Sequence, residues 1–120
     1  SGNIYLVVGC GGDRDVGKRP LMGKIALQYA DIVFYTSDNP RSESPREICT
    51  QMTAGLTTGA YHIELDRKKA IETAINMAGP EDLVVIAGKG HEDYQEINGQ
   101  RSYFSDEAVA KEALKLGSST

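Results

Sequence analysis

The stretch Ile4-Tyr5-Leu6-Val7-Val8-Gly9-Cys10-Gly11-Gly12 lies near the start of the chain, a β-branched apolar run that ends in glycines. Such a run is typical of a buried parallel strand that leads into a tight loop. Three further short apolar runs follow, at residues 32–35, 61–65 and 83–87. They predict three more strands of the same kind.

Helical patterns lie between these runs. Pro20 can begin a first helix, in which apolar residues recur at helical spacing as far as Tyr29. Ser44-Pro45-Arg46-Glu47 combines a capping box with proline at the first helical position, and Asp66 can cap a third helix that runs to Met77. Because parallel strands need crossover connections, this alternation predicts an α/β fold: a Rossmann-like, open, mostly parallel sheet with helices on both faces.

The last third of the chain departs from this alternation. Asn98-Gly99, within residues 96–101, predicts an antiparallel hairpin at the edge of the sheet, and Ser105-Asp106-Glu107 opens a last amphipathic helix. We therefore expect one domain over residues 4–116. Residues 1–3 resemble a cleavage scar, and residues 117–120 a flexible tail.

The composition limits the possible partners. The formal net charge of −4 and the isoelectric point near 5.1 argue against nucleic acid and anionic membranes, which both require a basic face. No apolar run approaches the roughly 18 residues of a membrane span, so we expect a cytoplasmic protein with small-molecule partners. Cys10 and Cys49 have neither zinc-site nor redox-pair spacing, and we expect both in the core.

In open parallel sheets, ligands bind beyond the carboxyl ends of the strands. The candidate loops therefore follow the first, second and fourth strands, at residues 9–20, 38–41 and 88–93. Each combines glycine or proline with fixed charges. Alternatively, any single charged residue in these loops forms a solvated ion pair at the surface, which contributes less than about 1 kcal/mol to stability.

The charges in these loops suit a zwitterion. Arg14 and Arg41 offer guanidinium forks that match carboxylates, while Asp38 and Glu92 can receive an ammonium group.

Nucleotide-binding motifs are incomplete. Gly9-x-Gly11 follows a strand, but arginine stands at position 14, where a dinucleotide fingerprint has its third glycine. Gly88-Lys89-Gly90 lacks the frame of a phosphate loop. We therefore expect no nucleoside triphosphate to be held in the usual way.

Four motifs together resemble the MurE family of peptidoglycan ligases in order and spacing. They are Gly11-Gly12-Asp13-Arg14-Asp15, Gly17-Lys18-Arg19-Pro20-Leu21-Met22-Gly23, Ser37-Asp38-Asn39-Pro40-Arg41 and Gly88-Lys89-Gly90-His91-Glu92. The resemblance implies the carboxy-terminal, amino-acid-binding domain of a ligase that adds meso-diaminopimelate to UDP-N-acetylmuramoyl-L-alanyl-D-glutamate.

The same resemblance implies roles for individual residues. Arg41 would select meso-diaminopimelate over lysine, because only the former has a second carboxylate for the guanidinium to hold. The implied contacts with this amino acid come from Arg14, Asp38, Asn39, Arg41, Gly88 and Glu92. His91 could touch substrate or serve the structure, and His62, in a predicted strand, is expected to be structural.

The resemblance also implies a reaction. ATP phosphorylates the D-glutamyl carboxylate, and the amine of diaminopimelate attacks the acyl phosphate. The resemblance implies that a central domain, absent here, mainly holds ATP and Mg²⁺, and that the UDP-linked dipeptide also binds through absent domains. We therefore expect this chain alone to hold no cofactor or metal and not to catalyse. Asp13, Lys18 and Arg19 would face ATP on domain closure, or else support their loop.

Two other functions remain open from the sequence. Gly9-x-Gly11 would fit a stand-alone Rossmann-type nucleotide-binding module. The charged loops would also fit a non-catalytic interaction domain that docks a partner protein.

Overall fold

The structure is a computed structural model, and it describes residues 2–11, 16–57, 59–87, 94–97, 100–103, 106, 109, 110 and 114. The strands are β1 (Ile4–Cys10), β2 (Ile32–Ser37), β3 (Ala60–Ile63), β4 (Leu83–Ala87), β5 (Tyr94–Ile97) and β6 (Gln100–Tyr103). The helices are the 3-10 turn η1 (Val16–Lys18) and the α-helices α1 (Arg19–Tyr29), α2 (Pro45–Met52) and α3 (Arg67–Met77).

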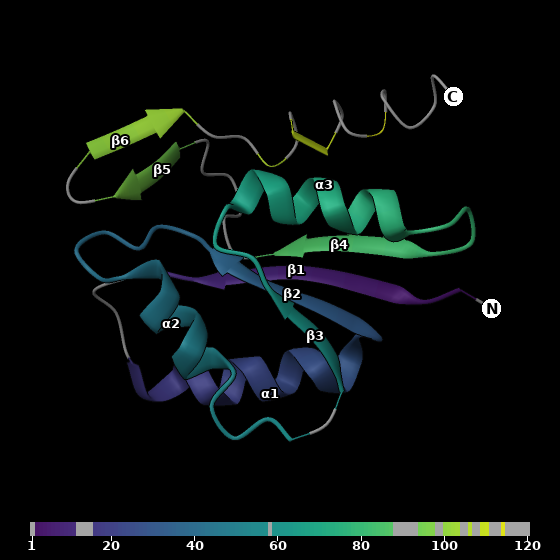
Figure 1. Ribbon diagram of the computed structural model, residues 1–120, viewed down its shortest axis with the longest axis horizontal. Helices are drawn as coiled ribbons and strands as arrows, with labels where there is room; N and C mark the ends of the chain where they lie inside the picture. The colour runs from purple at the N-terminus through teal and green to yellow at the C-terminus, as the bar shows by residue number, and fades with distance from the viewer. Residues whose placement is uncertain are drawn as a thin grey trace.

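Four strands form a parallel sheet in the order β3-β2-β1-β4. Helices α1 and α2 cover one face and α3 covers the other (Figure 1). The predicted α/β fold with helices on both faces is therefore confirmed. The strand order changes direction between β1 and β4, and the crevice at such a switch point is where open α/β sheets bind ligands.

Two predicted helix caps explain where α2 and α3 begin. The hydroxyl of Ser44 accepts a hydrogen bond from the backbone N–H of Glu47 at 3.4 Å, and the carboxylate of Asp66 accepts one from Lys69 at 3.3 Å. Each cap satisfies a donor that the first helical turn leaves unpaired. Because α2 follows β2 and α3 follows β3, both helices begin on the side of the sheet where the strands end.

The contact between α1 and α2 depends on Gly23. A Cβ atom there would lie 1.7 Å from the carbonyl oxygen of Met52, so only glycine allows the two helices to approach this closely. The Gly23 carbonyl also accepts a 2.6 Å hydrogen bond from the buried hydroxyl of Tyr35. The core on this face includes Cys10 and Cys49, which are buried and free, as expected.

Apolar spacing predicted the helix α1, but of the residues that form this pattern only Ala26 is buried. Leu21, Met22, Ile25 and Tyr29 are all exposed, whereas Arg19, Gly23 and Ala26 are buried. The close contact with α2 requires a small residue at position 23, and the large apolar side chains of α1 lie outside it. No helix among the described residues combines the length and the apolar character that a membrane crossing requires.

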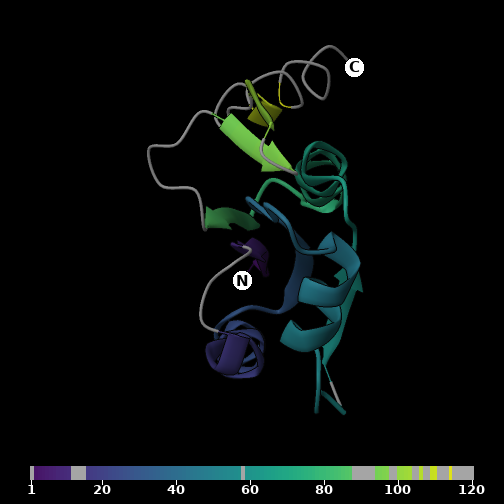
Figure 2. The same ribbon diagram turned by 90° about the vertical axis from the view of Figure 1, so that its left-hand side faces the viewer.

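Strands β5 and β6 pair antiparallel, but within the described residues they form a sheet of their own. The expectation that this pair would be the edge of the parallel sheet is therefore wrong. Figure 2 shows the pair on the side of α3, away from the parallel sheet. Asn98 and Gly99, on which the predicted turn rests, lie outside the described residues. The residues at 106, 109, 110 and 114 have helical backbone, in line with the last predicted helix.

Candidate functional site

The three candidate loops leave the parallel sheet at one edge. In the sheet register Cys10 pairs with Ser37, and Val8 pairs with Ala87, so the carboxyl ends of β1, β2 and β4 are neighbours. This common edge is the first requirement for a shared ligand site. The loop residues Asp13, Arg14, Gly88, His91 and Glu92 lie outside the described residues, and their roles stay predictions.

The segment 38–41 directly follows β2 and is packed into the sheet edge. Asp38 is 7% exposed and Asn39 is 1% exposed. The burial depends on Gly9, because a Cβ atom there would lie 2.9 Å from the backbone nitrogen of Asp38 and 2.8 Å from the carbonyl oxygen of Thr36. Gly9 therefore brings β1 against the start of this segment, a packing role that accounts for the glycine without any nucleotide.

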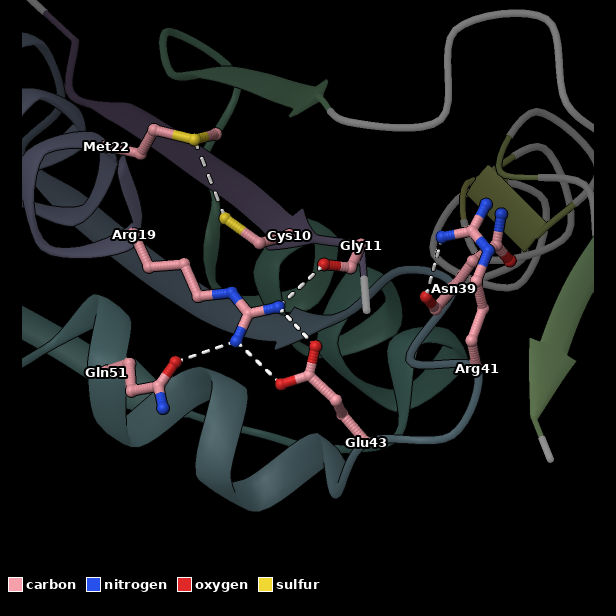
Figure 3. Close-up of polar contacts among 8 residues, drawn as sticks. All are labelled: Cys10, Gly11, Arg19, Met22, Asn39, Arg41, Glu43 and Gln51. Carbon is pink, nitrogen blue, oxygen red and sulfur yellow. Dashed lines mark hydrogen bonds and ion pairs between the residues drawn. The ribbon is translucent and has the colours of Figure 1, made fainter. Parts of the chain in front are cut away.

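Arg41 ends the segment in an unusual backbone conformation. Its φ angle is 55°, and it is the only non-glycine residue with positive φ among the described residues. Left-handed backbone costs a residue with a Cβ atom about 1–2 kcal/mol, and such strain is concentrated at functional sites. The Nη1 atom donates to the carbonyl oxygen of Asn39 at 3.2 Å, so the partly buried side chain folds back over the segment (Figure 3).

Arg19 supports this segment from the side. Its Nη1 and Nη2 atoms donate to the two carboxylate oxygens of Glu43 at 2.9 and 2.8 Å (Figure 3). Nη1 also donates to Oε1 of Gln51 at 2.7 Å, and Nη2 to the carbonyl oxygen of Gly11 at 3.0 Å. One guanidinium thus joins the end of β1, the loop after β2 and α2.

This arrangement bears on the expected contacts with ATP. Arg19 is only 1% exposed, so its guanidinium holds the loops together and is not presented to solvent, where a nucleotide would approach. The structure gives no support to an ATP contact for Arg19. Lys18 is exposed immediately before α1, and its contact with ATP stays a prediction.

A second buried arginine, Arg67, was missed by the sequence analysis. It is 1% exposed and lies at the first position of α3. Its Nη1 atom donates to the carbonyl oxygen of Ser37 at 3.1 Å, and its Nη2 atom to that of Ala87 at 3.2 Å. Asp106 accepts two hydrogen bonds of 2.7 Å from the same guanidinium. In the sequence, Arg67 is indistinguishable from a solvated arginine in a first helical turn.

A groove of about 550 Å³ lies elsewhere on the described part of the chain. It lies between α1 and the segment 54–59, and Lys24 is the only charged side chain that lines it. A single cation offers little charge complementarity to the zwitterion that the charged loops predict. The charged edge at the ends of β1, β2 and β4 is therefore the better candidate.

Fold and site define an α/β domain with a strained arginine and buried polar residues at the carboxyl edge of a parallel sheet, the arrangement of a small-molecule-binding domain. Residues 1–90 match the family described as "Mur ligase, glutamate ligase domain". The chain belongs to this family, as the four motifs predicted.

Two curated relatives share the same name. The "UDP-N-acetylmuramoyl-L-alanyl-D-glutamate--2,6-diaminopimelate ligase" of Chromobacterium violaceum is 52% identical over 113 residues, and that of Oceanobacillus iheyensis is 53% identical over 115. Each alignment covers 94% of this chain but 23% of the relative. The chain therefore spans about a quarter of the length of the curated relatives it matches.

A solved structure gives the same result. It is described as "Structure of UDP-N-acetylmuramoyl-L-alanyl-D-glutamate--2, 6-diaminopimelate ligase", and it matches with a TM-score of 0.95 and 47% sequence identity. The match covers all of this chain and 25% of the solved chain. The fold described above is therefore that of one part of a larger ligase.

Proposed function

We propose that this chain is the amino-acid-binding domain of an ATP-dependent ligase that adds meso-diaminopimelate to UDP-N-acetylmuramoyl-L-alanyl-D-glutamate. The observation that carries the proposal is Arg41, held in left-handed backbone at the end of a buried Asp-Asn-Pro-Arg segment. The names of the relatives support the same substrates. We propose that this domain extends from residue 4 to residue 116.

The chemistry of recognition follows from the difference between two amino acids. Meso-diaminopimelate carries a second carboxylate on its far carbon, and lysine does not. A guanidinium fork holds a carboxylate with two charge-assisted hydrogen bonds, and in a closed site it is left unpaired when lysine binds. We assign this selection to Arg41, with the remaining contacts from Arg14, Asp38, Asn39, Gly88 and Glu92.

In the reaction, this domain would place the attacking amine. Holding an amine against an activated carboxyl group can contribute several kcal/mol to lowering the barrier, of the order of 7 kcal/mol in well-oriented systems. None of the proposed contacts has to act as a nucleophile. The chain would thus be inactive without the other parts of the ligase.

ATP and Mg²⁺ belong to the proposed full ligase. Among the described residues there is no group of three or more His, Cys, Asp or Glu side chains that could hold a metal ion. No phosphate-loop motif is present for ATP either. We therefore derive no step through the nucleotide within this chain. The UDP-linked dipeptide would likewise bind elsewhere, and free, buried Cys10 and Cys49 fit a reducing cytoplasm.

The stand-alone nucleotide-binding module is not favoured. Its only support was Gly9-x-Gly11, and the contact of Gly9 with the segment after β2 accounts for that glycine. Each of the two curated relatives is also about four times as long as the part of it that this chain matches.

The test compares two amino acids in the complete ligase. Arg41→Ala and Arg41→Lys should each reduce kcat/KM for meso-diaminopimelate by at least about a hundredfold, with a much smaller effect on lysine. Lysine replaces the planar fork by a point charge, so Arg41→Lys should restore little of the preference. The measurement is the initial rate of ligation with each amino acid over a range of concentrations.

A matched control removes another guanidinium nearby. Arg46 is exposed in the first turn of α2, so Arg46→Ala should leave the preference within about twofold. If the ratio of kcat/KM for the two amino acids is the same in wild type and Arg41→Ala, the assignment of selectivity is wrong.

A further inference from the structure

We propose that Arg67 is a positioning residue that sets the spacing between the two amino-acid-binding loops, those after β2 and β4, and that Asp106 holds it in this role. The inference rests on the proposed function and extends it to a residue that contacts no substrate. It also assigns Asp106, which follows β6 in the chain, an indirect part in amino-acid binding.

The geometry places Arg67 between the two loops. Ser37 directly precedes the segment 38–41, and Ala87 directly precedes Gly88, and one guanidinium donates to the carbonyl oxygens of both. Strands β2 and β4 are not neighbours, because β1 lies between them. Backbone ladder hydrogen bonds therefore do not join β2 to β4, whereas Arg67 joins their ends directly.

Four of the five N–H donors of the Arg67 guanidinium make hydrogen bonds. Its three nitrogen atoms all donate: Nη1 to Ser37, Nη2 to Ala87 and to Asp106, and Nε to Asp106. The Arg67 side chain is inaccessible to solvent, while that of Asp106 is 21% exposed. A planar guanidinium has fixed donor directions, so a shift of either strand end would break a hydrogen bond in a buried place, where the loss is costly.

Helix stability alone does not account for this arginine. A cation at the amino end of a helix is opposed by the helix dipole, and Asp66 already caps α3. An acidic or neutral residue would therefore serve α3 better at position 67. The contacts of the guanidinium with the two strand ends explain why an arginine stands at position 67.

The test is kinetic and uses the complete ligase. Arg67→Lys keeps the charge but loses the fork, and Asp106→Asn keeps the shape but loses the charge that orients the fork. Each should raise KM for meso-diaminopimelate by about tenfold, because small misplacements of binding groups are costly, while KM for ATP and for the UDP-linked dipeptide should stay within about twofold. The preference for meso-diaminopimelate over lysine should fall together with the rise in KM.

The double variant tests whether the two residues act as one unit. Arg67→Lys combined with Asp106→Asn should raise KM for meso-diaminopimelate no further than the worse single variant, since both changes release the same guanidinium. Lys68→Ala is the matched control, because Lys68 is exposed beside Arg67 in α3. It should leave all three KM values unchanged.

The outcomes separate this inference from the proposed function. A purely structural role would lower kcat through a smaller folded fraction and leave every KM and the amino-acid preference unchanged, which would overturn the inference while the function stands. If Arg67→Lys does not fold, Asp106→Asn alone decides by the same criterion. A wild-type ligase that does not use meso-diaminopimelate would overturn both.

Discussion

At the scale of single residues, two buried arginines hold the strand ends and loops together at the carboxyl edge of the parallel sheet. The guanidinium of Arg19 is compensated by Glu43 and that of Arg67 by Asp106. Their partners lie 24 and 39 positions away in the sequence. No local pattern connects such positions, so the sequence indicated Arg19 only as a residue for loop support or ATP, and Arg67 not at all.

Arg19 should be important for the stability of the chain. Removing one partner of a buried ion pair leaves an uncompensated charge or an unsatisfied site, which costs about 3–5 kcal/mol. Because Glu43 is 27% exposed, we expect Arg19→Ala to lower the free energy of unfolding by about 3 kcal/mol and Glu43→Ala to lower it less. The measurement is urea denaturation of the 120-residue chain, followed by circular dichroism.

Lys24→Ala, an exposed change in the same helix, is the control and should have an effect within about 0.5 kcal/mol. A similarly small effect for Arg19→Ala would show that the network in Figure 3 contributes nothing to stability.

At the scale of elements, the local signals predicted the existence of the helices and strands well. Ser44 and Asp66 cap α2 and α3 as expected, because capping depends on residues three positions apart. The sequence predicted α1 but not its buried face, because Gly23 and the neighbouring Met52 decide that face through a contact between helices. Apolar periodicity describes one helix by itself and does not contain that contact.

Gly23 offers a test of the α1–α2 contact. In an isolated helix, Gly→Ala stabilises by about 1 kcal/mol. Here the added Cβ atom would overlap the Met52 carbonyl, so we expect Gly23→Ala to lower the free energy of unfolding by about 2 kcal/mol despite the better propensity. Thermal denaturation of the chain measures the change.

The comparison is Leu21→Ala in the same helix, where the residue is 58% exposed and a loss below about 1 kcal/mol is expected. An increase in stability for Gly23→Ala would mean that α1 and α2 are farther apart than the structure shows.

At the scale of the whole molecule, the sequence predicted a parallel sheet but not the order of its strands. That order, β3-β2-β1-β4, brings the ends of β2 and β4 to either side of β1 and makes room for one guanidinium to reach both. The sequence also placed the candidate site at the carboxyl edge, because the position of the loops follows from the fold class alone. The left-handed backbone of Arg41 could not be predicted, since arginine rarely adopts it.

The central claim is that an amino acid with a charged group at each end binds at this edge. It is tested most directly by titrating the isotope-labelled chain with meso-diaminopimelate and following the backbone amides by nuclear magnetic resonance. We predict saturable shifts at Asp38, Asn39 and Arg41 below about 10 mM, which are lost in Arg41→Ala and much weaker with lysine. Saturable shifts centred instead on Leu27 and Gln28 in the groove beside α1, or none at residues 38–41, would contradict the account.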